Sequence, residues 1–123
     1  MAIATMNVVV LDCPDPKQLA EFYAAVLGGE VEDPGEQTEW VNMSAPGIRL
    51  AFQESPGFIP PQWPSLEHAQ QLHLDFNVPK ARWDEAERQV TELGAKLVQS
   101  DEGKRDFRVY LDPAGHPFCF CAC

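Results

Sequence analysis

The chain has 123 residues, of which 45% are hydrophobic, and its 19 acidic and 9 basic residues give a formal net charge of -10. A chain of this length buries a core without disulfides, and its negative charge, with no local stripe of basic residues, argues against a nucleic-acid partner. Because there is no run of about 18 apolar residues and no basic stretch followed by an apolar one, we expect a cytoplasmic protein without membrane span or signal peptide.

The first half of the chain has the pattern of a strand, a helix and three further strands. An apolar run at 7–13 predicts the first strand. The helix follows in PDPKQLAEFYAAVLGG, where Asp15 is a good N-cap, Pro16 suits the first helical position and Gln18 the capping-box position. The glycine pair then predicts its end. Three short strands are expected at 30–31, 38–44 and 48–53.

The second half repeats this order. A strand is predicted at 71–78, an amphipathic helix within 79–94 with Trp83, Ala86, Val90 and Leu93 on one face, and strands at 95–100, 106–112 and 116–123. The pairs LD, PK and LG recur at a spacing of about 65 residues, which indicates a duplicated βαβββ unit. We expect one domain over 1–123: module one at 1–54, an extended proline-rich linker at 55–70 and module two at 71–123.

Each predicted sheet has a single helix, which covers only one of its faces. The opposite, concave face of each module must therefore meet a ligand or another subunit. The expected class is α+β.

Three stretches together carry a family resemblance: DPKQLAEFYAAVLGG, the strand opening HLDF, and the closing DPAGHPF. With two βαβββ modules, the chain resembles the vicinal oxygen chelate superfamily, which contains glyoxalase I, bleomycin-resistance proteins and extradiol dioxygenases. It is most similar to the small bacterial glyoxalase-like domains. The resemblance implies a cupped, barrel-like mixed sheet with the helices outside, and a homodimer.

The resemblance also implies a divalent metal held by His and Glu residues on the first and last strands of each module. One of the four positions is retained, as His73. The others fall on Val8 or Val10, on Cys119, and on Leu50, Phe52 or Gln53. We therefore expect no cofactor. The alternative is a divalent metal on His73 and Cys119, a soft pair better suited to zinc or copper(I).

His73 and Asp75 share one face of their predicted strand, while Leu72, Leu74 and Phe76 share the other. The apolar set should pack on the helix, so that His73 and Asp75 look into the cup as a general base with its carboxylate. The alternative is an ordinary amphipathic strand.

Aromatic residues supply candidate ligand contacts: Trp40, Phe52 and Trp63. Arg108 and Tyr110 are further candidates, and Arg108 in the cup would favour an anionic ligand. They alternate with Phe107 and Val109, and the sequence leaves open which pair faces the cup.

The remaining cysteines and histidines favour structural roles. Cys119, Cys121 and Cys123 fall on one strand face without the paired spacing of a zinc site, so they are expected to act as small hydrophobic residues. His116 lies in a turn and His68 in the linker, where it is expected at the surface.

Three functions follow. The first is a binder of a small organic molecule with an aromatic cup and without the full metal site. The second is a metal-dependent lyase, isomerase or dioxygenase using His73. The third is a partner domain whose concave face is filled by a second subunit. Whether the modules pair within one chain or between chains stays open.

Overall fold

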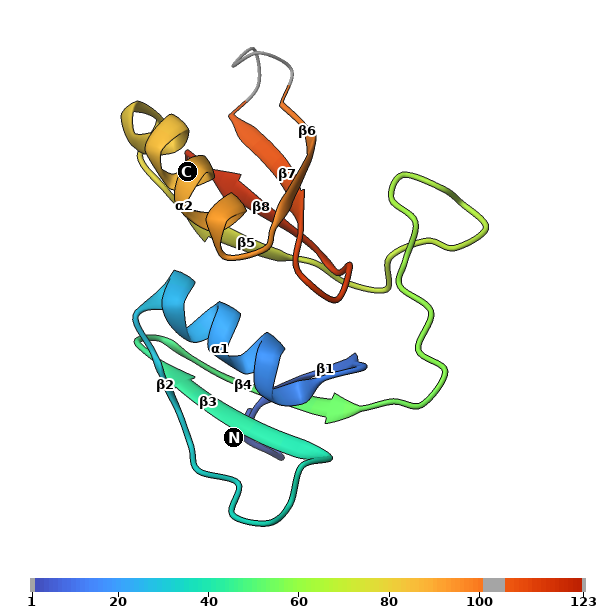
Figure 1. Ribbon diagram of the computed structural model, residues 1–123. Helices are drawn as coiled ribbons and strands as arrows, with labels where there is room; N and C mark the ends of the chain where they lie inside the picture. Colours follow the sequence, from blue (N-terminus) through green and yellow to red (C-terminus); the bar gives the residue numbers. More distant parts are fainter. Residues whose placement is uncertain (1, 101–105, 123) are drawn as a thin grey trace. The chain divides into compact units, whose positions relative to one another are not determined.

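The computed structural model describes residues 2–100 and 106–122, and this part of the chain divides into two compact units, Met1–Phe58 and Ile59–Cys123. Each unit contains one four-stranded mixed sheet and one α-helix (Figure 1). Their strand orders are equivalent, β1-β4-β3-β2 and β5-β8-β7-β6. In each sheet the first strand of the unit pairs in parallel with the last, and the other neighbours are antiparallel.

The first unit contains β1 (Val9–Cys13), α1 (Pro16–Leu27), β2 (Glu30–Val31), β3 (Trp40–Ala45) and β4 (Ile48–Glu54). The Asp15 side chain accepts a hydrogen bond from the backbone N–H of Gln18 and so caps the start of α1. At the other end Gly28 takes a left-handed conformation, φ +68°, which a glycine adopts without steric cost.

The core of the first unit lies between its sheet and α1. Strand alternation sends Leu11, Val41 and Phe52 to the helix side, where all three are buried. The Phe52 ring stacks on Tyr23 of α1, with ring centroids 5.9 Å apart. This burial of large apolar side chains stabilises the unit.

The second unit contains β5 (Leu74–Asn77), the short 3₁₀ helix η1 (Lys80–Arg82), α2 (Trp83–Glu92), β6 (Lys96–Gln99), β7 (Phe107–Leu111) and β8 (Pro117–Cys121). Its core again lies on the helix side of the sheet. Trp83 begins α2, is 1% exposed, and donates from its indole Nε1 to the Val78 carbonyl at 2.8 Å. Phe118 and Phe120 of β8 are buried beside it in an aromatic cluster with Tyr110.

These observations confirm the α+β class and the two βαβββ modules, with sheets that are cupped rather than closed. The prediction that Leu93 lies on the apolar face of the helix is wrong. α2 ends at Glu92, so Leu93 is its C-cap residue and is 43% exposed. The predicted last strand ends at Cys121, and Cys123 lies outside the described residues.

Residues 55–70 form neither helix nor strand. Within residues 2–100 and 106–122, no helix has the length and apolar character needed to span a bilayer.

Candidate functional site

A pocket of about 410 Å³ lies in the second unit, on the face of the sheet opposite α2. Its apolar wall comes from Trp63, Phe107, Val109, Pro117 and Cys121. Its polar side chains are Gln70, His73, Asp75, Asp106 and Cys119. A largely apolar pocket with a few convergent polar groups is the usual form of a small-molecule site.

Strand register explains why these side chains meet. Asp75 of β5 and Val109 of β7 both pair with Cys119 of β8, so the three form one row across the sheet. In the next row Phe107 pairs with Cys121. Residues two apart on a strand share a face, and paired residues on neighbouring strands do too, so one face collects them all.

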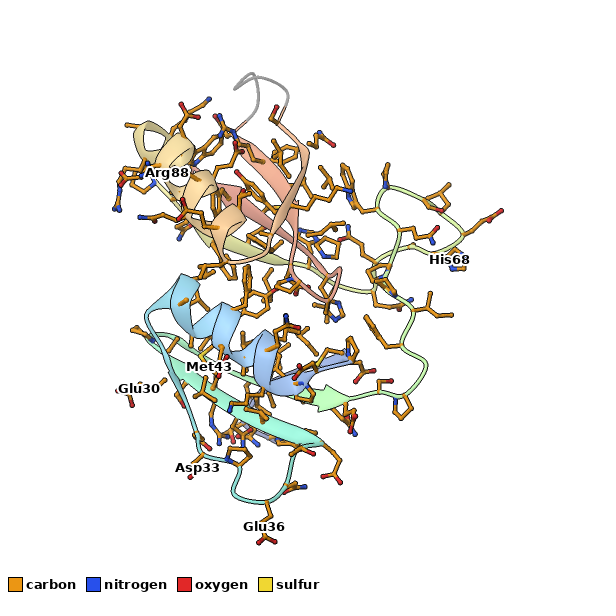
Figure 2. All side chains as sticks on the ribbon, in the orientation of Figure 1. Glu30, Asp33, Glu36, Met43, His68 and Arg88 are labelled. Atoms are coloured by element: carbon orange, nitrogen blue, oxygen red, sulfur yellow. The ribbon has the colours of Figure 1, made fainter. Side chains whose placement is uncertain are left out.

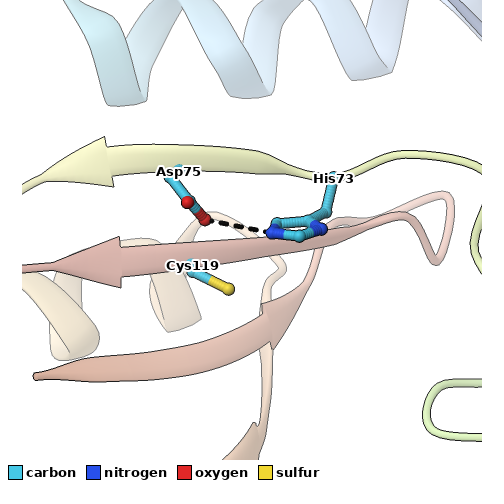
Figure 3. A group of neighbouring side chains, drawn as sticks. All are labelled: His73, Asp75 and Cys119. Carbon is cyan, nitrogen blue, oxygen red and sulfur yellow. Dashed lines mark ion pairs between the residues drawn. The ribbon is translucent and has the colours of Figure 1, made fainter. Parts of the chain in front are cut away.

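The polar side of the pocket is built around Asp75 (Figure 3). His73 Nε2 lies 3.3 Å from Asp75 Oδ1, and the side chains are 40% and 55% exposed. Cys119 is 8% exposed, and one donor atom from each of the three residues lies within 4.8 Å of the others. The arrangement can orient an imidazole beside a carboxylate, as a general base requires.

The Cys119 thiol is held in its neutral form. Its burial, together with the charge of Asp75 and the hydrogen bond to it, raises the pKa of the thiol to about 12. Because the thiolate is the reactive form of cysteine, Cys119 is a hydrogen-bond donor to Asp75 rather than a nucleophile at neutral pH.

Four of the predicted site residues therefore come together in the pocket: His73, Asp75, Trp63 and Cys119. Trp63 also packs against the small apolar cluster of Val109, Cys119 and Cys121. Cys119 and Cys121 are buried there beside apolar side chains.

Trp40 and Phe52 lie elsewhere, in the first unit. Phe52 is fully buried on the helix side of its sheet, which corrects its expected place in a cup. Trp40 is half-buried on β3 and donates from its indole Nε1 to Asn42 Oδ1 at 3.0 Å. Neither lines the pocket.

Arg108 and Tyr110 are also corrected: of the two alternating pairs on β7, Phe107 and Val109 take the pocket face. Arg108 forms ion pairs with Asp84 at 3.1 Å and Glu87 at 3.3 Å, both on α2. The Tyr110 hydroxyl donates to Glu87 Oε1 at 2.8 Å, and burial, with Glu87 beside it, raises the pKa of Tyr110. The α2 carboxylates thus hold this pair on the helix side.

Six pocket residues were not assigned to the site from the sequence: Phe107 and Val109 were left open as one of two alternating pairs, and the others are Gln70, Asp106, Pro117 and Cys121. A signal for two of them was present. Asp84 and Glu87 are three apart on the predicted helix and share a face, so they mark the side to which Arg108 turns and leave the other side to Phe107 and Val109. Gln70 carried no such signal because it precedes the strand.

The two other histidines lie away from the pocket lining. His116 is in the turn before β8, where its backbone N–H donates to Asp112 Oδ1 at 3.0 Å. His68 is exposed in the segment between the modules (Figure 2).

Residues 8–121 match the sequence model of the family described as the glyoxalase-like domain, and the chain belongs to that family. The family, the duplicated topology and the structural neighbours together place the fold in the superfamily that the sequence resembles. A comparison with curated protein sequences finds no match.

Solved structures share the fold at low sequence identity. A glyoxalase/bleomycin resistance protein/dioxygenase family enzyme from Burkholderia phytofirmans PsJN is 16% identical, with a TM-score of 0.74, over 95% of this chain and 97% of its own. The fosfomycin resistance protein FosX from Mesorhizobium loti is 13% identical, with a TM-score of 0.72, over 99% and 94%.

A third neighbour carries ligands. The E126Q mutant of FosX from Listeria monocytogenes, complexed with Mn(II) and 1S,2S-dihydroxypropylphosphonic acid, is 13% identical with a TM-score of 0.71. The alignment covers 98% of this chain and 93% of that one. At these identities the likeness establishes the fold alone.

Proposed function

We propose that this chain binds a small organic molecule in the pocket of its second unit. The observation that carries the proposal is the pocket itself, in which an apolar wall faces the group of His73, Asp75 and Cys119. The apolar wall excludes water from the body of a ligand, and the polar group fixes its orientation.

Trp63 and Phe107 would both contact the ligand. Trp63 stands in the segment between the modules and Phe107 on β7, so the ligand contacts side chains far apart in the sequence. Aromatic walls contribute large contact areas with few rotatable bonds.

Fluorine NMR of protein labelled with 5-fluorotryptophan tests this proposal. The chain has three tryptophans, so Trp63→Phe, Trp40→Phe and Trp83→Phe assign the signals. We expect a bound aromatic fragment, with 2-naphthalenemethanol as the first probe, to shift the Trp63 signal. Trp83 lies on the other side of the same sheet and Trp40 in the other unit, so both signals serve as internal controls. A ligand that shifts Trp40 and not Trp63 would contradict the pocket.

A metal-dependent enzyme is the second candidate, and one observation favours it. His73, Asp75 and Cys119 offer an imidazole nitrogen, a carboxylate oxygen and a sulfur that already lie within 4.8 Å of one another. Such a mixed set fits zinc, with a fourth position left for substrate. Asp75 is thus a third possible ligand beside the pair expected from the sequence. The Mn(II) of the FosX complex shows that a relative of this fold holds a divalent ion.

In that enzyme a bound metal would act as a Lewis acid on a substrate oxygen. The chain's own residues would do the rest: His73, Asp75 and Cys119 would hold the ion, and the apolar wall would exclude water from the substrate. The reaction would be a lyase, isomerase or dioxygenase reaction.

Elemental analysis of protein purified without a His tag or chelator separates the two candidates. The enzyme candidate predicts stoichiometric metal that is lost in His73→Ala and retained in His68→Ala, a matched exposed histidine. Equal metal in both variants would contradict this ligand set, and activity in protein stripped of metal would contradict the metal-dependent mechanism.

Three further expectations complete the proposal: the two units act as one domain, the protein is a homodimer, and it works in the cytoplasm. The open face of each sheet, uncovered by a helix of its own unit, supports a second subunit as its cover. Sedimentation equilibrium tests the dimer, and a monomer at micromolar concentration would contradict it.

A further inference from the structure

We infer that the pocket takes an organic cation, an ammonium group carried on an apolar or aromatic body. This inference rests on the proposed binding function and names the class of ligand. It follows from the charges and the hydrogen-bond groups that the described residues present to the pocket.

The charged groups that line the pocket are acidic. Asp75 and Asp106 both line it, and no lysine or arginine does so among the residues that the structure describes. Lys80 Nζ lies 3.5 Å from Asp106 Oδ1, so it partly neutralises the negative charge of that carboxylate. Asp75 is therefore the main charged group of the pocket.

Asp75 has neighbours that leave its charge available. His73 contacts one oxygen of Asp75, with Nε2 3.3 Å from Oδ1. The Asp75 side chain is 55% exposed, so a carboxylate oxygen remains open to a ligand. A charge-assisted hydrogen bond from an ammonium group to a carboxylate is about twice as strong as a neutral one.

Gln70 supplies a second reason. Its side-chain oxygen Oε1 is buried and has no hydrogen-bond partner among the described residues, although Gln70 lines the pocket. A buried acceptor without a donor costs free energy, and a ligand N–H would satisfy it. The pocket therefore presents acceptors at Asp75, Asp106 and Gln70, which matches a ligand rich in donors.

The aromatic wall fits the same ligand. Trp63 and Phe107 line the pocket, and a cation over an indole face is attracted by the ring's quadrupole. The one arginine that the sequence offered for an anion, Arg108, is held by Asp84 and Glu87 on the other side of the sheet. The pocket thus differs in charge preference from the FosX complex, whose ligand is a phosphonic acid.

A series of ligands matched in shape tests the inference. 2-Naphthylmethylamine, 2-naphthalenemethanol and 2-naphthoate share one ring system and differ in charge. By titration calorimetry at pH 8 we expect the amine to bind about tenfold more tightly than the alcohol, and the carboxylate to bind most weakly. Asp75→Asn should lower the amine affinity about tenfold and so remove the advantage of the amine over the alcohol. Asp33→Asn, an exposed aspartate of the first unit, is the matched control.

A second measurement needs no variant. Raising the salt concentration from about 50 to about 500 mM should lower the affinity for the amine several-fold. The affinity for the alcohol should not change, because salt screens only the charged pair. Equal affinities for amine and alcohol, with the Trp63 signal shifted by both, would overturn the cation preference and leave the binding function intact. If no member of the series shifts Trp63, both proposals are contradicted.

Discussion

The two sheets have the same topology, but the faces opposite their helices differ in chemistry. In the second unit one row across the sheet reads Asp75, Cys119, Val109, and His73 lies beside it. On the same face of the first unit, two successive rows read Asp12, Gln53, Trp40 and Val10, Ala51, Asn42, and neither row contains a cysteine or a histidine. The helix sides, by contrast, are largely apolar in both units, although Arg108 pairs there with Asp84 and Glu87 in the second.

The difference shows that packing against the helix constrains the residues on one face of each sheet more than those on the opposite face. The helix side must be apolar in any module, because it makes the core that holds the helix on the sheet. The opposite face carries no such requirement, so its residues diverge without unfolding the module. Every described residue that lines the pocket belongs to the second unit.

The largest effect should come from comparing two phenylalanines. Phe52 is fully buried against Tyr23, whereas Phe107 is half-buried in the pocket wall. Phe52→Ala should lower the free energy of unfolding by about 3–5 kcal/mol. Phe107→Ala should lower the free energy of unfolding by about 1–2 kcal/mol. It should also lower the affinity for 2-naphthalenemethanol at least about tenfold. Urea denaturation and calorimetry measure the two effects. A larger stability loss for Phe107→Ala would reverse the assignment of faces.

Two arginines give the next contrast. The Arg108 side chain is 14% exposed and pairs with Asp84 and Glu87, while Arg49 is 38% exposed and pairs with Glu32. Arg108→Met should lower the free energy of unfolding by about 1–3 kcal/mol, because the half-buried carboxylate of Glu87 loses its ion-pair partner. Arg49→Met should change stability by less than about 1 kcal/mol.

Arg108→Met also tests the corrected placement of this side chain. Because Arg108 lies on the helix side, we expect unchanged affinity for 2-naphthylmethylamine in the folded variant. An affinity that rises or falls several-fold would place the guanidinium within reach of the ligand after all. Arg49→Met, in the other unit, is the control for a general change in net charge.

The smallest effect concerns pH and Cys119. The pKa of this thiol is raised to about 12 in the folded protein, so the folded state keeps the proton at a pH where the unfolded thiol has lost it. The stabilisation is complete below the ordinary thiol pKa and is lost as pH rises toward 12. Between pH 8 and 10.5 we expect a loss of about 1 kcal/mol that Cys119→Val removes. An identical pH dependence in Cys119→Val would contradict this origin.

Much of the architecture could be predicted from the sequence because it depends on local signals. Asp15, Pro16 and Gly28 mark the ends of α1. Strand alternation predicted that His73 and Asp75 lie on one side, and their side chains do meet, although β5 begins only at Leu74 and His73 precedes it. The repeat of these signals then predicted the two modules. Such signals act between residues that are close along the chain, so they can be read without a structure.

Tertiary structure decided which of two equivalent choices each strand makes. On β7 the alternation allowed either pair to face the pocket, and the carboxylates of Asp84 and Glu87, packed from α2, hold Arg108 and Tyr110 on the helix side. The pocket arises from the same cause, since only the register between β5 and β8 sets Asp75 beside Cys119. A shift of one residue would turn every side chain to the other face, and long-range packing alone prevents it.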